Sequence, residues 1–270
     1  MRMNPITSSA AARIVHLIDS LAGLSSLAPG PAVDGIFGEL VTTVLGAPED
    51  HATDVLADPG VRARRALLHD LSARGEAERE QSWATRIRDA ADPHAELAAF
   101  PYRGNYERLA RLELGVVNRH ATAPVRSVAV LGSGPLPLTA LAWASALSVP
   151  VTGVDSDPSA TSLAESVALA LGAPHVRFET ADARDTDLAG HDLVFLAALV
   201  GATPAEKAEI AAKVRSTMRP GTLLLARTAR GLRTLLYPPV DTGALQGFDV
   251  LEIAHPTENV VNSVVLARAA

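Results

Sequence analysis

The residues numbered 125 to 137 decide the fold, and they read Val-Arg-Ser-Val-Ala-Val-Leu-Gly-Ser-Gly-Pro-Leu-Pro. The opening run is apolar and β-branched, which predicts a buried strand that ends at Gly132. Gly132 and Gly134 then permit a tight turn and let the backbone approach a ligand closely. A helical pattern follows at 138–148. A strand, a glycine loop and a helix in this order predict a nucleotide-binding unit of an α/β protein.

The chain continues downstream as an alternation of strand and helix patterns. We expect strands at 149–154, 176–180, 193–199 and 223–226, and helices at 159–171 and 204–218. Such alternation predicts a parallel sheet with helices on both faces. Two last strands, expected at 249–255 and 261–267, have no helix between them, only a short connection that includes residues 256–259, and should pair antiparallel. The prediction for 124–270 is therefore a Rossmann-type domain, doubly wound and mostly parallel with one antiparallel strand, as in the class I methyltransferase fold.

The first 123 residues have a different, helical periodicity. Helices are expected at 11–28, 33–45, 62–74, 76–90 and 106–117. Asp34 is an acid suited to the start of its helix, and Gly75 separates the third helix from the fourth. No strand alternation is convincing in this half. We therefore predict an N-terminal helical bundle over 1–123 that serves as a lid or substrate domain.

Composition excludes several classes of protein and of site. The chain has 270 residues, a formal net charge of -6 and no cysteine. The acidic balance argues against nucleic acid and anionic membranes as partners. Without cysteine there are no disulfides, thiol nucleophiles or Cys-ligated zinc. No apolar run is long enough for a membrane span. We expect a cytoplasmic protein that binds small molecules, with a homodimer left open.

Three features of the second half together predict a site for an adenosine. The third glycine of G-x-G-x-x-G is replaced by Pro137, and prolines remove N–H donors, which argues against a bound pyrophosphate. Asp155 ends the next strand, where an acid accepts from ribose hydroxyls. Asp182 follows the third strand, where an acid can accept from the adenine amino group. The nucleotide-binding residues expected here are Gly132, Ser133, Gly134, Pro135, Asp155, Asp182, Ala183 and Leu199.

Two clusters stand out in the helical half. Phe100-Pro-Tyr102-Arg103-Gly-Asn105-Tyr106 holds two of the three tyrosines in the chain. Its ordinary explanation is a proline-led turn whose aromatics fill a domain junction. Upstream, Glu76, Glu78 and Glu80 share a helix with Arg79 and Trp83. The ordinary explanation of such a charge run is a solvated helix face.

The sequence resembles the nicotianamine synthase family, including the related bacterial metallophore synthases of the histidine 2-aminobutanoyltransferase type. Separated blocks carry the resemblance across roughly residues 75 to 268. They are Glu80 with Trp83-Ala84; Glu96-Leu-Ala-Ala-Phe100 through Tyr106, with Leu109, Leu112 and Glu113; Leu131 to Thr139; Asp155 to Ala160; Asp192 to Gly201; Glu206-Lys207; Tyr237-Pro; Gly247 to Leu251; His255-Pro-Thr257; and Asn262 to Arg268.

The resemblance implies a particular use of S-adenosylmethionine. The family moves its 3-amino-3-carboxypropyl group, rather than its methyl group, to an amine and releases methylthioadenosine, in the synthesis of metallophores. By resemblance Glu80 is the general base and Tyr106 positions the reacting chain. Tyr102 and Asn105 are then expected beside the substrate. Arg103 departs from the family, which often has an aromatic residue there, and we expect Arg103 to meet a carboxylate of the substrate or of a helix.

Other functions stay open at this point. The acceptor is either another S-adenosylmethionine-derived unit or an amino acid such as histidine. An ordinary S-adenosylmethionine-dependent methyltransferase shares the fold, and a cyclase that forms azetidine-2-carboxylate shares the reacting group. A non-enzymatic alternative is a ligand-binding module. The eight histidines are scattered with no pair at ligand spacing, so we expect no metal held by the protein.

Overall fold

The first half of the chain is helical, as expected. The structure is a computed structural model that describes residues 5–256 and 260–270. Its helices up to residue 120 are α1 (Pro5–Ala22), α2 (Pro31–Gly46), α3 (Glu49–Ala57), α4 (Pro59–Asp89), α5 (Pro93–Ala98) and α6 (Arg103–His120). The short helices α3 and α5 were not expected. Asp34 lies in the first turn of α2, as its position suggested.

Helix α4 corrects the prediction that Gly75 separates two helices. The helix is continuous through Gly75. A methyl group built on Gly75 would lie 2.5 Å from Cζ of Phe37. The glycine therefore makes room for the Phe37 ring of α2 while it keeps its helical conformation.

The second half forms a seven-stranded sheet in the order β3-β2-β1-β4-β5-β7-β6. Its strands are β1 (Val128–Leu131), β2 (Val151–Asp155), β3 (Val176–Thr180), β4 (Leu193–Leu196), β5 (Leu223–Thr228), β6 (Phe248–Ala254) and β7 (Ser263–Ala269). The neighbouring strands from β3 to β5 pair parallel, whereas β7 pairs antiparallel with both β5 and β6. The predicted fold is confirmed. Residues 257–259 of the last connection, including Thr257 of the His255 block, lie outside the described residues.

Helices cover both faces of this sheet. They are α7 (Leu138–Leu147), α8 (Pro158–Ala170) and α9 (Pro204–Thr217), joined by the earlier α6. Trp143 of α7 and Val116 of α6 share an apolar core with one face of the sheet. Ile210 and Val214 of α9 pack in the core of the other face. Although α6 thus packs on the sheet, it precedes residue 123, and the division of the chain at 123/124 stays a prediction.

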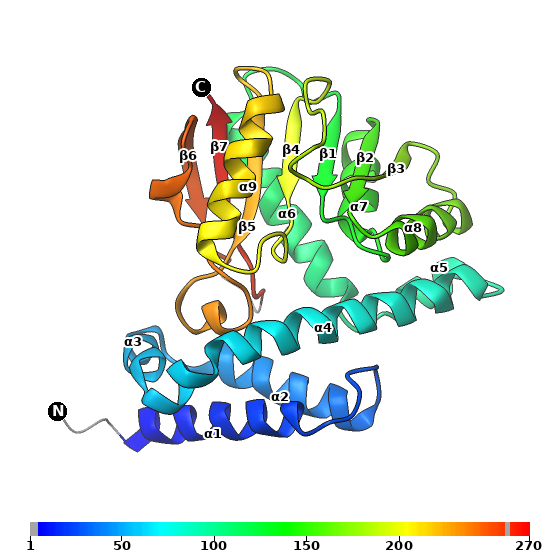
Figure 1. Cartoon of the computed structure of the whole chain (residues 1–270). Coiled ribbons are helices and arrows are strands. Elements are labelled where there is room, and N and C mark those ends of the chain that lie inside the picture. The colour runs from blue at the N-terminus through cyan, green and yellow to red at the C-terminus, as the bar shows by residue number, and fades with distance from the viewer. Residues whose placement is uncertain (1–4, 257–259) are drawn as a thin grey trace.

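The helical layer lies across the carboxyl ends of the parallel strands. Helix α4 runs below that edge of the sheet, with α1 and α2 beneath it (Figure 1). A 3₁₀ segment after β5, η1 (Gly231–Leu235), reaches back into this layer, where Leu232 and Leu235 join its apolar core. A second one, η2 (Thr242–Ala244), follows. Ligands of open α/β sheets bind at the carboxyl edge, so this arrangement places the site between the sheet and α4. No helix among the described residues has the length and apolar character of a membrane span.

Candidate active site

A cavity of about 830 Å³ lies between the two layers. The loops after β1, β2, β3 and β4 form one end of it, which we call the sheet end. Side chains of α2, α4 and the segment after η1 form the other, which we call the helical end. Every nucleotide-binding residue predicted from the sequence lines the sheet end, namely Gly132, Ser133, Gly134, Pro135, Asp155, Asp182, Ala183 and Leu199.

The glycine loop is held in shape by Asp155. Gly132 and Gly134 have φ angles of +75° and +66°, which side chains other than hydrogen rarely allow. The Gly134 N–H donates to Asp155 Oδ2 at 2.9 Å, and the Asp157 N–H donates to Asp155 Oδ1 at 3.1 Å. Because each carboxylate oxygen can accept a second hydrogen bond, Asp155 retains acceptor capacity toward the cavity. Its position at the end of β2 therefore fits both loop support and ribose recognition.

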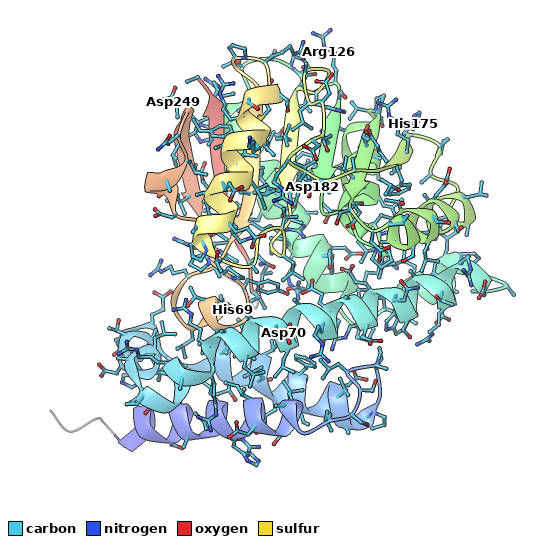
Figure 2. The ribbon with its side chains drawn as sticks, in the orientation of Figure 1. His69, Asp70, Arg126, His175, Asp182 and Asp249 are labelled. Atoms are coloured by element: carbon cyan, nitrogen blue, oxygen red, sulfur yellow. The ribbon has the colours of Figure 1, made fainter. Side chains whose placement is uncertain are left out.

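The Asp182 carboxylate, unlike that of Asp155, is already paired with a charged side chain. It accepts from Nε and Nη2 of Arg184 at 2.9 and 2.7 Å, and these hydrogen bonds lower its pKa to about 2. Figure 2 shows Asp182 in front of the sheet, near the edge that faces α4. An adenine amino group would have to share this carboxylate with Arg184, so the predicted adenine contact stays a prediction.

Glu80 of α4 lies where the two ends of the cavity meet. The Tyr106 hydroxyl donates to Glu80 Oε1 at 3.2 Å. On its other side, a methyl group built on Gly134 would lie 2.5 Å from Glu80 Oε2. Burial, reinforced by the nearby Glu76 carboxylate, raises the pKa of Glu80 to about 8. The general base and positioning hydroxyl that were predicted from resemblance therefore lie in contact, against the glycine loop.

Glu76, one helical turn before Glu80, forms a second pair of this kind. The Tyr237 hydroxyl donates to Glu76 Oε2 at 2.8 Å. Burial also raises the pKa of Glu76 and of Tyr237. Glu78 is exposed, so the solvated-face explanation of the charge run holds for Glu78 and fails for its two neighbours in the pattern.

The aromatic block packs against α4 next to Glu80. The Phe100 ring packs against Trp83, Tyr102 and Tyr106, with ring centroids 5.3, 5.9 and 6.3 Å apart. The Arg79 guanidinium lies 4.7 Å from the Tyr102 ring centroid and 3.7 Å from Asp34. Both Tyr102 and the predicted substrate-binding Asn105 line the cavity.

Arg103 is placed differently from the expectation that it binds substrate. Its Nε donates to Glu107 at 2.8 Å, one turn along the exposed side of α6. The side chain lies outside the described lining of the cavity. The sequence left two partners open for Arg103, a carboxylate of the substrate or of a helix. In the structure the partner is the carboxylate of Glu107 on the same helix.

A buried ion pair that the sequence did not predict closes the cavity beside Tyr106. Arg227 Nε donates to Glu113 Oε1 at 2.7 Å, Arg227 Nη2 donates to Thr139 Oγ1 at 3.0 Å, and Glu113 has no exposed surface. The guanidinium also lies 4.7 Å from the Phe195 ring centroid. Glu113 belongs to a block of the family resemblance, but Arg227 gave no signal because it lies within the apolar strand β5.

Lys207 shapes the loop after β4. Its ammonium donates to the carbonyls of Ala198 and Val200 at 2.5 and 2.7 Å. Burial lowers the pKa of Lys207 to about 8. The loop carrying Leu199 is thereby fixed against the cavity. Among residues 5–256 and 260–270, no three side chains of His, Asp or Glu gather as a metal site.

Comparison with known proteins identifies the family. The family described as nicotianamine synthase protein matches residues 4–270. Nicotianamine synthase 9 of Hordeum vulgare is 38% identical over 266 residues, covering 95% of this chain and 77% of the relative. Nicotianamine synthase 1 of Arabidopsis thaliana is 37% identical, covering 95% of this chain and 82% of the relative.

Solved structures show the same fold over the whole chain. MtNAS in complex with MTA and tNA superposes with a TM-score of 0.86 at 19% identity, and the match covers 100% of both chains. A variant of MtNAS in complex with S-adenosylmethionine superposes with a TM-score of 0.82 at 21% identity, covering 96% of this chain and 98% of the other.

Proposed function

This chain belongs to the nicotianamine synthase family, and from that premise we propose how its cavity performs the family's reaction. The enzyme is an S-adenosylmethionine-dependent aminocarboxypropyltransferase that acts in metallophore synthesis and releases methylthioadenosine. The residue roles given below are proposed. S-adenosylmethionine is a substrate here, and the sheet end of the cavity fits its adenosine because a loop of positive-φ glycines leaves room beside Asp155.

The sulfonium of S-adenosylmethionine activates all three carbons bonded to sulfur. Which carbon reacts depends on which one lies in line with the nucleophile. We place the aminocarboxypropyl chain beside Tyr106 and Glu80, because these side chains adjoin the glycine loop. The acceptor nitrogen forms a bond to the chain's terminal CH₂, the carbon–sulfur bond breaks, and its electron pair stays on sulfur. The sulfur product is neutral methylthioadenosine.

Glu80 takes the proton that the acceptor amine loses. Without ligand, Glu80 holds a proton at neutral pH because its pKa is about 8. When the donor binds, its cationic sulfonium favours the ionised carboxylate, so Glu80 releases its proton to solvent and becomes available as a base. The amine then attacks as a neutral nucleophile and transfers its proton to Glu80. Tyr106 donates its hydroxyl to the Glu80 carboxylate and fixes its orientation.

The observation that carries this assignment is the position of Glu80 between Gly134 and Tyr106. The test is mass spectrometry of the purified protein with S-adenosylmethionine, with and without candidate amino acids. Methylthioadenosine together with an acceptor heavier by one aminocarboxypropyl group is the expected result. S-adenosylhomocysteine with a methylated acceptor would contradict it, and azetidine-2-carboxylate alone would point to cyclisation.

Two further expectations from the sequence are kept as proposals. A cytoplasmic location fits the cysteine-free composition. Fractionation of the native cells would test it. The homodimer is tested by sedimentation of the purified chain.

A further inference from the structure

Lysine is rare in this chain, and one of its lysines is buried. Lys207 and Lys213 are the two lysines of the sequence, and both lie on α9. Lys213 is exposed, as lysines usually are, whereas Lys207 keeps 1% of its surface exposed. Burying an ammonium removes its hydration, and an apolar side chain of similar size would avoid that cost. The charge of Lys207 therefore points to a role that an apolar residue could not fill.

Backbone carbonyls, rather than a carboxylate, are the partners of this charge. Lys207 is in no ion pair among the described residues, and its ammonium donates to the carbonyls of Ala198 and Val200 at 2.5 and 2.7 Å. These two residues flank Leu199 in the loop after β4. Leu199 lines the sheet end of the cavity, whereas Lys207 lies outside the described lining. Lys207 thus contacts the backbone of this loop from outside the cavity.

The loop and the start of α9 fit closely around Lys207. Gly201 has a φ of +80°, and a methyl group built on it would lie 2.8 Å from Cγ of Lys207 and 2.9 Å from its backbone N. The first turn of α9 is capped, because Thr203 Oγ1 accepts from the Glu206 N–H at 3.1 Å and Glu206 Oε2 accepts from the Ala202 N–H at 2.7 Å. The lysine therefore extends from a capped helix turn onto the adjacent loop.

The same loop contacts the glycine loop of the sheet end. A methyl group built on Gly132 would overlap Cγ2 of Val200, and the Ala197 N–H donates to the carbonyl of Leu131 at 3.1 Å. A shift of Val200 would therefore open a gap against Gly132. The hydrogen bonds of Lys207 consequently hold two walls of the nucleotide site at once, the loop after β4 and the glycine loop.

We propose that Lys207 is a positioning residue for the donor. Its two hydrogen bonds hold residues 197–201 against the glycine loop, in the shape that binds the methylthioadenosine part of S-adenosylmethionine. That part of the donor is bound both before and during transfer. Loss of an interaction made in both states raises KM and leaves kcat unchanged. This inference rests on the proposed function, since it assumes that the nucleoside occupies the sheet end.

Lys207→Met tests this role, because methionine keeps an unbranched chain of similar length and lacks the ammonium. We expect KM for S-adenosylmethionine, and Kd for methylthioadenosine by calorimetry, to rise about tenfold to a hundredfold, the effect of losing hydrogen bonds to a charged group. The kcat at saturating donor should stay within about threefold of wild type. Lys213→Met removes the exposed lysine of the same helix and should leave all three constants unchanged.

The split between KM and kcat separates positioning from a general loss of structure. A purely structural role would lower the fraction of active enzyme, and so kcat, without raising KM. Wild-type values of KM and Kd in Lys207→Met overturn the inference, and so does a fall in kcat alone.

A second pair of variants decides the matter if Lys207→Met melts early by circular dichroism. Gly201→Ala pushes the loop away from Lys207, whereas Gly221→Ala has a similar φ of +86° and meets nothing within 4 Å. Only Gly201→Ala should raise KM for S-adenosylmethionine. Equal KM values in the two variants overturn the inference.

Wild type provides a third measurement, because two lysines give two side-chain ammonium signals in a ¹⁵N-lysine NMR spectrum. Coupling between two events is reciprocal, so hydrogen bonds of Lys207 that favour the binding of methylthioadenosine must be favoured by it. Saturating methylthioadenosine should slow solvent exchange of the Lys207 ammonium about tenfold or more and leave that of Lys213 unchanged. Equal exchange of Lys207 with and without methylthioadenosine contradicts the inference.

The proposed function fails separately from this inference. If wild type converts S-adenosylmethionine into S-adenosylhomocysteine, the aminocarboxypropyl transfer is wrong, while the comparison of KM values still decides the role of Lys207. If wild type releases methylthioadenosine but Lys207→Met keeps the wild-type KM, only the role of Lys207 is wrong.

Discussion

Glu80 combines two properties that rarely occur together in one carboxylate. It is enclosed enough for its pKa to rise to about 8, yet it lies in contact with the loop that should hold a cationic substrate. The enclosed site keeps the group protonated until the donor arrives. The sulfonium then favours ionisation at the moment when a base is needed.

Replacing Glu80 by Gln should therefore abolish transfer without abolishing donor binding. Gln keeps the size and the hydrogen bond with Tyr106 but cannot accept a proton. We expect kcat for methylthioadenosine release to fall by about 10²- to 10⁴-fold, the usual contribution of a general base. Chromatographic assay of methylthioadenosine gives kcat, and calorimetry gives the affinity for S-adenosylmethionine. Turnover like that of wild type would remove Glu80 from the mechanism, while Glu78→Gln should leave turnover unchanged.

The sequence predicted one of the two carboxylate–tyrosine pairs better than the other. Glu80 and Tyr106 lie in blocks of the family resemblance and were both expected at the site, and the structure brings them into contact. Glu76 and Tyr237 are 161 positions apart, and no local pattern shows that the chain brings them within hydrogen-bond distance. Arg103 stood in a recognisable block, but its side chain leaves the cavity because Glu107 lies one turn away on the same helix face.

At the scale of an element, the glycine loop makes a prediction with a matched control. Gly134→Ala places a methyl group 2.5 Å from Glu80 Oε2 at a φ of +66°, whereas Gly172→Ala has a φ of +64° and meets nothing within 4 Å. Both changes cost about 1–2 kcal/mol of backbone strain. Only Gly134→Ala should also displace Glu80 and lower kcat/KM for S-adenosylmethionine. Equal kcat/KM in the two variants would show that the contact between loop and Glu80 is unimportant.

Gly75 makes a similar prediction for the packing of two helices. Alanine normally favours a helix over glycine by about 0.5–1 kcal/mol. At Gly75 the added methyl group would meet the Phe37 ring at 2.5 Å, whereas at Gly38 of α2 it meets nothing within 4 Å. We expect Gly75→Ala to destabilise by about 1–3 kcal/mol through overpacking. Gly38→Ala should stabilise the protein by about 0.5–1 kcal/mol. Urea unfolding measures both, and a stabilised Gly75→Ala would contradict the packing argument.

Gly75 also shows why element boundaries were harder to predict than element types. A glycine within a helical pattern indicates either an end or a close approach of another element, and only the position of Phe37 decides between them. The strand at 176–180 was predicted with the bounds that β3 has. The alternation of Val176 and Phe178 with polar residues is a local feature, so no distant residue was needed to recognise the strand.

For the whole molecule, alternation along the chain was sufficient to predict the sheet and its antiparallel strand. The way the two layers join was not predictable, because it depends on a segment of the second half of the chain that packs among the N-terminal helices. The segment η1 follows β5 yet packs with α1 to α4, and His69 of α4 contacts the carbonyl of Thr234 at 2.8 Å. Figure 2 shows His69 on the part of α4 beside this segment. The cavity forms where such long-range contacts bring the helical layer and the sheet together.

Because Glu80 is enclosed in this cavity and its pKa is raised, the free energy of unfolding should depend on pH. Glu80 has an ordinary pKa of 4.5 when the chain is unfolded and about 8 when it is folded. Between these values the folded chain binds more protons than the unfolded chain, so this group's contribution to the free energy of unfolding falls as the pH rises. The contribution is complete below pH 4.5 and is lost as the pH passes through about 8. The slope for one such group is at most about 1.4 kcal/mol per pH unit.

Comparison with Glu80→Gln isolates this contribution, because the variant has no proton to lose at this position. Lys207, whose pKa is lowered to about 8, and the other titrating groups remain in both proteins, so their effects largely cancel in the difference. Urea unfolding from about pH 5 to about pH 8.5 should show wild type losing stability relative to the variant as the pH rises. Saturating S-adenosylmethionine should reduce this slope, since its positive charge compensates the ionised carboxylate. A difference that does not change with pH would mean that Glu80 is ionised before the donor binds, and the base would then need no donor to prepare it.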